Sequence, residues 1–262
     1  MPEIKSNKPA RIDVSEGGAI PRKSDSGLFT AWRVAIVGAI VCVAWLVIFK
    51  PDPYKKILFF VHDGIYITFQ VTIMAIVLSV IIGLIAGLGR ISKNRIINGI
   101  ASLYVEVIRG IPLLVQLFYI YYALGRLVQL TDITCAVIAM SICYGAYIAE
   151  IFRAGIEAVP NGQTEAARSL GMTPYQTMRH VILPQAIKTI LPPVGNEFVA
   201  LLKDSSLVSI LAVSDLLRRG REYASESFNY FEAYTMVALV YLIITLVLSK
   251  LVGIMEEKIN VD

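Results

Sequence analysis

Apolar residues in this chain come in long runs that no charged residue interrupts. A helix needs about 20 mostly apolar residues to span a bilayer. Five uninterrupted runs approach or exceed that length: Val34–Phe49, Gly64–Gly89, Gly110–Gly125, Ile133–Ala149 and Ala233–Ser249. A sixth hydrophobic region, residues 190–217, contains charged residues as well. With charges tolerated at the edges, we expect six spans, near residues 34–49, 64–89, 98–124, 133–157, 190–217 and 233–253.

The composition agrees with a membrane protein. Of the 262 residues, 56% are hydrophobic and 17% are charged, whereas a soluble domain has roughly 45–50% apolar and about 25% charged residues. The cysteines Cys42, Cys135 and Cys143 all lie in uncharged runs without metal-ligand spacing, which indicates packed side chains. We therefore predict an all-α, multi-pass membrane protein and exclude a soluble globular domain.

The two ends of the chain differ from this pattern. Residues 1–30 are basic and rich in Pro, Gly and Ser, which predicts a disordered tail. Residues 31–50 are predicted to form an extra, retained N-terminal transmembrane helix, because no small-residue cleavage site follows Phe49. Most Lys and Arg residues of the connecting segments lie on the side of the N-terminus, so we expect both termini, including a tail over 255–262, in the cytoplasm. The arginines from Arg218 to Arg221 are on the outer side, against this rule.

A polar segment, residues 158–189, separates the fourth and fifth predicted spans. Gly171 suits the left-handed position after a helix, and Thr173 with Gln176 has the spacing of a capping box, so we expect two short helices joined at a corner. An apolar corner with a charged rim is typical of a surface that docks another protein; a helix pair lying on lipid is the alternative. The apolar residues at the corner are Leu170, Met172, Tyr175 and Met178.

The same segment resembles the EAA loop of ATP-binding-cassette (ABC) importer permeases. It contains Glu165-Ala166-Ala167, then Gly171, then Leu183-Pro184, with Val181 where the family has Ile. The stretches EVIRGIPLLVQLFYIYYAL, YIAEIFRAGIEAVPNGQTEAA and NEFVALLKDSSLVSI resemble the polar amino-acid branch of that family. The resemblance covers residues 58–254 and implies a type I ABC importer-like transmembrane domain of five core helices, preceded here by the extra span.

The resemblance implies a permease for polar amino acids that is not itself an enzyme. Its EAA loop would dock on a separate cytosolic ATPase, through Glu165, Ala166, Ala167, Gly171, Met172, Leu183 and Pro184. The sequence lacks the G-x-x-x-x-G-K-[ST] phosphate-binding motif, so we expect no cofactor in this chain and ATP with Mg²⁺ bound by the ATPase. Further implied partners are a second permease chain, identical or related, an extracytoplasmic solute-binding protein and the lipid of the cell inner membrane.

Polar residues inside the predicted spans are the candidates for a substrate path, because such residues are costly in lipid. Glu197 and Asp204 share a helix face near mid-membrane, where an amino acid needs partners for its ammonium and carboxylate groups. Arg109 lies near the start of the third span and is predicted to extend to the membrane surface. The candidates are Gln116, Tyr119, Glu150, Asn196, Glu197, Lys203, Asp204 and Ser205, with structural ion pairing as the alternative for the charged ones.

A secondary transporter or channel and a membrane enzyme are two other classes of function. A self-contained secondary transporter or channel is the alternative, but the sequence shows no internal repeat of the kind such transporters carry. A membrane enzyme would need a nucleophile with its base, or a metal set, and His62 and His180 are both expected at aqueous edges. The net charge of +4 is explained by basic residues that flank spans, so no nucleic-acid partner is expected.

Overall fold

A computed structural model describes residues 30–261, so the tail predicted over residues 1–30 lies outside the described residues except for Thr30. Its elements are all helical within this range. They are α1 (Ala31–Phe49), α2 (Pro51–Arg90), α3 (Arg95–Gly110), α4 (Leu113–Tyr119), the π-helix η2 (Ile120–Gly125), α5 (Arg126–Val128), α6 (Asp132–Glu157), α7 (Asn161–Ser169), α8 (Pro174–Thr177), the π-helix η3 (Met178–Ile182), α9 (Leu183–Asp204), the 3₁₀ helix η4 (Ser205–Leu211), α10 (Leu216–Ser227) and α11 (Tyr230–Val261).

Four helices in the described range are long and apolar enough to cross a membrane: α1, α2, α6 and α11. The bent pair formed by α3 and the segment from α4 to α5 would be a fifth span. α1, over the residues predicted as an extra N-terminal span, is an apolar helix that packs against α11. There, Trp32 Nε1 donates a hydrogen bond to the Leu246 carbonyl at 2.8 Å, and the Lys250 ammonium lies 5.8 Å from the centre of the Trp32 ring.

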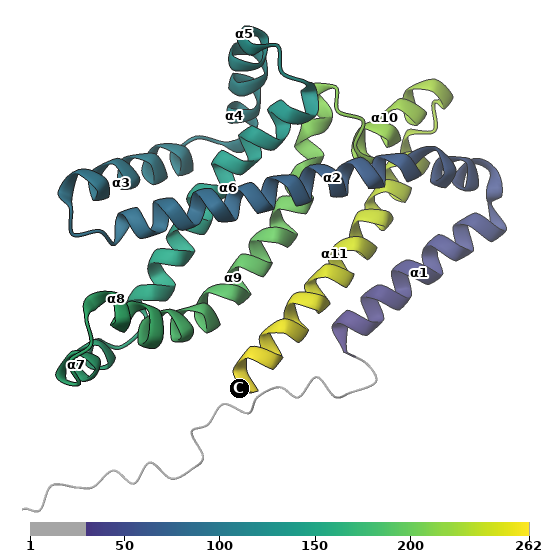
Figure 1. Ribbon diagram of the computed structural model, residues 1–262. Coiled ribbons are helices and arrows are strands. Elements are labelled where there is room, and N and C mark those ends of the chain that lie inside the picture. The colour runs from purple at the N-terminus through teal and green to yellow at the C-terminus, as the bar shows by residue number, and fades with distance from the viewer. Residues whose placement is uncertain (1–29, 262) are drawn as a thin grey trace, which may run out of the picture.

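The centre of the molecule is the crossing of α2 with α6 (Figure 1). Ser79, Gly83 and Gly87 follow each other on one face of α2 and are buried against α6. A Cβ atom at Gly83 would lie 2.6 Å from Ile148 Cγ2, and one at Gly87 would lie 2.8 Å from the Ala149 carbonyl oxygen. The small residues thus let the two backbones approach closely, as the sequence pattern predicts for helices in lipid.

α2 is longer than the predicted second span because it begins at Pro51. Its first turns carry Tyr54, Ile57 and Val61, whose spacing places them on one helix face. These side chains are buried in an apolar cluster with residues of α10 and α11, such as Leu216 and Met236. Packing against these helices therefore extends α2 into a segment expected to be a loop.

The third predicted span, residues 98–124, is not one straight helix. α3 ends at Gly110, and the segment Leu113–Val128 is bent from it by 103°. Pro112 has no N–H to continue the hydrogen-bond ladder, and the residue before a proline is disfavoured in helical conformation. Ile111 is accordingly extended, with φ −109° and ψ 128°. The expectation of an uninterrupted span is wrong at this point.

The fifth predicted region, residues 190–217, also has different bounds. α9 begins at Leu183 and ends at Asp204, and the chain then tightens into η4. Ala212 takes a left-handed conformation (φ 65°), which turns the chain before Asp215 caps α10. The charged residues of this region therefore lie near the C-terminal end of a helix that continues out of the 158–189 segment.

Segments predicted on the same side of the membrane lie at the same end of the molecule. The end of α2, the helices α7 and α8, and the C-terminal end of α11 gather toward the lower left of Figure 1. α5, α10 and the connection between α1 and α2 lie toward the opposite end. Residues 255–261 of the predicted C-terminal tail are helical, since α11 continues to Val261, and residue 262 lies outside the described residues.

Candidate functional site

The predicted corner in the 158–189 segment is confirmed in detail. Gly171 has φ +80°, and its N–H donates to the Arg168 carbonyl while the Met172 N–H donates to the Ala167 carbonyl. These two bonds form a Schellman motif, which closes the end of α7. Thr173 caps α8, and Gln176 completes the capping box by accepting from the Thr173 N–H at 2.8 Å. We call the region from α7 to α8 the α7–α8 corner.

One side of the corner is packed and the other is exposed. Met178, on η3, packs against the buried Ile156, Ile182, Ala186 and Ile190 at the ends of α6 and α9. The two large apolar side chains at the tip point the other way, since Leu170 is 84% exposed and Tyr175 is 69% exposed.

The seven residues predicted for coupling do not share one environment. Glu165, Ala166 and Gly171 are exposed, and Pro184 is exposed near the start of α9. Met172 and Leu183 are half-buried, and Ala167 is buried beneath the turn. The exposed residues and the apolar tip form the surface that a partner could contact.

A separate pocket of about 370 Å³ lies between α3, α6 and α9. We call it the α3–α6–α9 pocket. Polar and aromatic side chains line it, together with residues at the break between α3 and α4. Its lining residues are Arg109, Gly110, Ile111, Pro112, Leu113, Cys143, Tyr144, Tyr147, Glu197 and Asp204.

The pocket holds two carboxylates and one guanidinium. The Tyr144 hydroxyl donates to Asp204 Oδ2 at 2.8 Å, which ties α6 to the end of α9. The Arg109 guanidinium carbon lies 5.2 Å from the centre of the Tyr147 ring, within the range of a cation–π contact. Glu197 lies two helical turns before Asp204, and both line the pocket as their spacing predicts.

The other candidates on α9 lie elsewhere. Asn196 and Lys203 are exposed and do not line the α3–α6–α9 pocket. Each directly precedes a carboxylate that does line it, and a helix turns neighbouring side chains to different directions. Ser205 is buried, and its hydroxyl donates to the Leu202 carbonyl at 2.7 Å, so it closes the end of α9.

Gln116 and Tyr119 lie on α4, outside the α3–α6–α9 pocket. Both line a neighbouring, almost wholly apolar pocket of about 340 Å³ between the bend and α6. Tyr119 is 72% exposed, whereas Gln116 is buried and donates to backbone carbonyls of the bend.

Glu150 takes part in an ion network rather than in the pocket. Its carboxylate contacts Arg90 at the end of α2 and Arg153 one turn further along α6. Arg153 also contacts Glu157. The geometry supports the structural alternative for Glu150, because both of its oxygens already have guanidinium partners.

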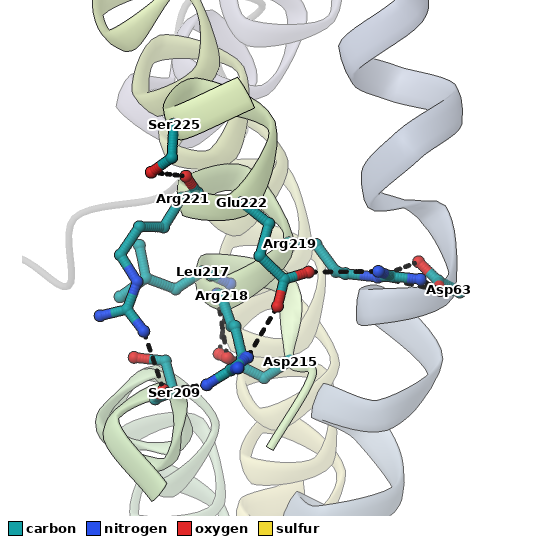
Figure 2. A network of polar contacts seen from close by, with 9 residues as sticks. All are labelled: Asp63, Ser209, Asp215, Leu217, Arg218, Arg219, Arg221, Glu222 and Ser225. Atoms are coloured by element: carbon teal, nitrogen blue, oxygen red, sulfur yellow. Dashed lines mark hydrogen bonds and ion pairs between the residues drawn. The ribbon is translucent and has the colours of Figure 1, made fainter. Parts of the chain in front are cut away.

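The arginines that break the charge rule form a second network at the other end of the molecule (Figure 2). Arg219 Nε on α10 lies 3.0 Å from each carboxylate oxygen of Asp63 on α2. Arg218 pairs with Glu222, and Arg218 and Arg221 both donate to the Ser209 carbonyl of η4, at 3.4 and 3.3 Å. These arginines are used to hold α10 against α2 and η4, which accounts for their position on the predicted outer side.

The sequence reasoning missed part of the pocket. It assigned Arg109 to the membrane surface, whereas the structure places it in the pocket beside Tyr147. It also passed over Tyr144 and Tyr147. Their spacing on α6, among mostly small side chains, was a signal of a shared aromatic face.

The comparisons with known proteins now bear on this arrangement. The family model of the binding-protein-dependent transport system inner membrane component matches residues 79–261. This chain belongs to that family. It is 42% identical over 200 residues to the probable amino-acid permease protein YxeN of Bacillus subtilis (strain 168), a match that covers 74% of this chain and 88% of that one. It is 37% identical over 202 residues to the glutamine transport system permease protein GlnP of Escherichia coli (strain K12), covering 76% and 92%.

Solved structures of transporters share the fold of this inner membrane component. A crystal structure of an amino acid ABC transporter with histidines matches with a TM-score of 0.74 and 43% identity, over 80% of this chain and 97% of that one. An inward-facing structure of the MetNI methionine ABC transporter matches with a TM-score of 0.69 at 20% identity, and this likeness bears on the fold alone. The predicted all-α, type I ABC importer-like fold is thus confirmed.

Proposed function

We propose that this chain is the membrane-spanning permease subunit of an ATP-driven importer for polar amino acids. The observation that carries the proposal is the match to a solved amino acid ABC transporter chain, at 43% identity over 97% of that chain. Relatives named as amino-acid and glutamine permeases support the same class of substrate.

The α3–α6–α9 pocket supports an amino acid as the substrate. Arg109 supplies donors for a carboxylate, and Glu197 and Asp204 supply acceptors for an ammonium group. The two carboxylates exceed the one guanidinium by one negative charge, which favours an amino acid with a positively charged side chain. Competition between labelled L-arginine and unlabelled arginine, lysine, histidine, glutamine and glutamate tests this preference. We expect the cationic competitors to act at the lowest concentrations, and stronger competition by glutamate would contradict it.

The α7–α8 corner supports coupling to a separate cytosolic ATPase. Its apolar tip, Leu170 and Tyr175, is exposed, and Glu165 and Arg168 are exposed beside it, which is the anatomy of an anchor with a charged rim. In this proposal the ATPase binds ATP with Mg²⁺ and its closure moves the corner. The packing of Met178 against the ends of α6 and α9 then passes the motion to the spans.

The remaining partners follow from the importer class. A second permease chain, identical or related, completes the path, and a solute-binding protein delivers the amino acid on the outer side. The chain would lie in the cell inner membrane with α7, α8 and both termini in the cytoplasm, in agreement with the bias of basic residues.

Co-purification tests the coupling directly. The tagged full chain, extracted from its native membrane in mild detergent, should retain a protein with a G-x-x-x-x-G-K-[ST] motif. Gly171→Pro should abolish this retention, because proline cannot adopt the positive φ of the corner. Gly162→Ala is the control, since a Cβ at Gly162 meets nothing within 4 Å. Failure of the wild-type chain to retain any such protein, or uptake without ATP, would favour a self-contained transporter or channel.

A further inference from the structure

The bend between α3 and α4 leaves backbone carbonyls without helical partners. In a continuous helix the Ile108 carbonyl would accept from the N–H of residue 112, but Pro112 has none, and the Ile108 carbonyl instead accepts a long bond of 3.3 Å from the Ile111 N–H. The Ile111 carbonyl would accept from Val115, whose N–H instead donates to the Pro112 carbonyl at 3.0 Å. The Ile108 carbonyl thus keeps only one long backbone bond, and the N–H that would pair with the Ile111 carbonyl is used elsewhere. A weakly paired carbonyl inside a membrane protein is costly, so a further donor is favourable here.

Gln116 supplies that donor. Its Nε2 atom lies 2.9 Å from the Ile108 oxygen and 2.8 Å from the Ile111 oxygen. A side-chain amide has two N–H donors, so one group on α4 pairs with both carbonyls at the end of α3. Gln116 is 7% exposed, and its Nε2 also lies 3.7 Å from Cys143 Sγ on α6. The same amide therefore joins α3, α4 and α6.

The residues held by this amide form one side of the α3–α6–α9 pocket. Arg109 is the neighbour of Ile108, and Gly110, Ile111 and Pro112 line the pocket directly. Gln116 itself does not line this pocket. Any effect of Gln116 on the pocket must therefore pass through the bend.

We propose that Gln116 is a positioning residue whose amide fixes the bend between α3 and α4 and thereby holds Arg109 in the pocket. The inference rests on the proposed import of amino acids for its functional part, and on the geometry of the bend alone for its structural part. Gln116→Glu is a variant of nearly the same shape, and its carboxyl donates one hydrogen bond when protonated and none when ionised, so it cannot pair both carbonyls. Gln116→Met removes the donors without adding a charge, and Gln129→Glu adds the same charge at an exposed position.

The structural part is tested by the distance between spin labels on Ile100 and Leu127, which are 66% and 82% exposed on the two arms of the bend. The labels are placed in the full chain with Cys42 and Cys135 replaced by alanine and Cys143 by serine, whose oxygen keeps an acceptor near the Gln116 amide. We expect one narrow distance distribution for the parent and for Gln129→Glu. Gln116→Glu and Gln116→Met should both broaden or shift it. An unchanged distribution in both variants overturns the proposal.

The functional part is tested by the amount of L-arginine or L-glutamine imported per ATP hydrolysed, in proteoliposomes that contain the complete transporter. We expect Gln116→Glu to lower this ratio about tenfold or more, because small misplacements of positioning groups have effects of this size. A loss of folded protein alone would lower uptake and ATP hydrolysis together and leave the ratio unchanged. If Gln116→Glu changes the distance between the spin labels but not the amount of amino acid imported per ATP, the proposed effect of Gln116 through Arg109 is overturned. Absence of ATP-driven uptake by the wild type refutes the proposed function and leaves the distance test of the bend intact.

Discussion

At the scale of single residues, Gly171 determines the shape of the α7–α8 corner. Its φ of +80° lies in the region that side chains with a Cβ disfavour, and a Cβ there would meet no other atom within 4 Å. Backbone conformation, and not space, is therefore the reason for glycine at this position.

Gly171→Ala should strain the corner by about 1–2 kcal/mol. We expect less amino acid imported per ATP in proteoliposomes and a lower melting temperature of the purified transporter. Gly162→Ala serves as the control, because it lies inside α7, where alanine is favoured over glycine. Equal behaviour of the two variants would show that the left-handed corner is not required.

A second residue with a predicted effect on stability is Asp215, the N-cap of α10. Its carboxylate accepts from the N–H groups of Leu217 and Arg218 at 3.2 and 3.0 Å and lies 3.4 Å from the Tyr241 hydroxyl. The side chain is fully buried, and this burial raises the pKa of Asp215 to about 6.

The raised pKa predicts a pH dependence of stability. The unfolded carboxyl releases its proton near its ordinary pKa of about 4, whereas the folded one holds it to about 6. The contribution of this group to stability is therefore present below pH of about 4 and is lost as the pH rises through about 6. Asp215→Asn keeps a capping oxygen and should remove this decline. Melting curves between pH 4 and 7, with Asp52→Asn as an exposed control, measure the difference. Parallel curves for Asp215→Asn and wild type would contradict the prediction.

At the scale of elements, α2 and α6 are joined by close contact and by charge. Glycines let the helices touch in the middle, and the contact of Arg90 on α2 with Glu150 on α6 joins them at the end nearest the α7–α8 corner. α6 leads into α7 through only a short connection, Ala158–Pro160. We expect the ends of α2 and α6 to move as a unit with the corner.

The ionic joint predicts strong non-additivity between Arg90→Gln and Glu150→Gln. Each single variant leaves a partly buried charge with fewer partners, whereas the double variant removes both members of the contact. We expect a coupling energy of about 0.5–3 kcal/mol in the melting of the purified transporter. The exposed Lys56–Asp52 pair is the control, and it should couple by less than about 1 kcal/mol. If the effects of the two variants on stability are additive, Glu150 is again a candidate for the substrate path.

The close packing of α2 on α6 predicts that replacing glycine by valine costs different amounts of stability at Gly83 and Gly38. Gly83→Val should destabilise the protein by about 1–3 kcal/mol or more, because its side chain would overlap Ile148 on α6. Gly38→Val places the side chain in open space on α1 and should be nearly neutral. Thermal unfolding in detergent compares them, and a similar loss for both would refute close α2–α6 contact.

Local chemistry explains which elements the sequence could predict. Glycine, capping residues and uncharged runs act over a few residues, so the corner, most spans and the stripe from Ser79 to Gly87 were predictable. Pro112 is visible in the sequence, but the third span was expected to run across it without a bend. The partnership of Gln116 with carbonyls before the break depends on tertiary geometry. Only part of the α3–α6–α9 pocket could be predicted. Arg109 and Tyr144 reach this pocket from α3 and α6, and the way these helices pack depends on tertiary contacts.

At the scale of the whole molecule, α1 lies outside the part of the chain that the family model matches. The family match begins at residue 79, and the relatives YxeN and GlnP match about three-quarters of this chain over most of their own length. α1 packs on α11 and α2, on the side of the molecule opposite α3 and α7 in Figure 1. The surface that α1 covers is apolar and would otherwise face lipid tails, which solvate it well.

A chain that lacks residues 1–49 should therefore insert, bind the ATPase and import amino acids at a rate within about threefold of the full chain. We expect a lower melting temperature, since the contact between Trp32 and α11 is lost. Uptake and ATPase assays on both forms in proteoliposomes compare them. Loss of uptake with normal insertion and ATPase binding would assign α1 a role in transport.

The central claim is that this chain imports amino acids only as part of an ATP-driven complex. The most direct measurement is uptake of labelled L-arginine and L-glutamine into proteoliposomes that contain the purified complex, with its solute-binding protein outside and ATP–Mg²⁺ inside. The account predicts accumulation of at least one of them against a gradient, dependent on ATP hydrolysis and lost in Gly171→Pro. Uptake that proceeds without ATP, or that persists undiminished in Gly171→Pro, would contradict it.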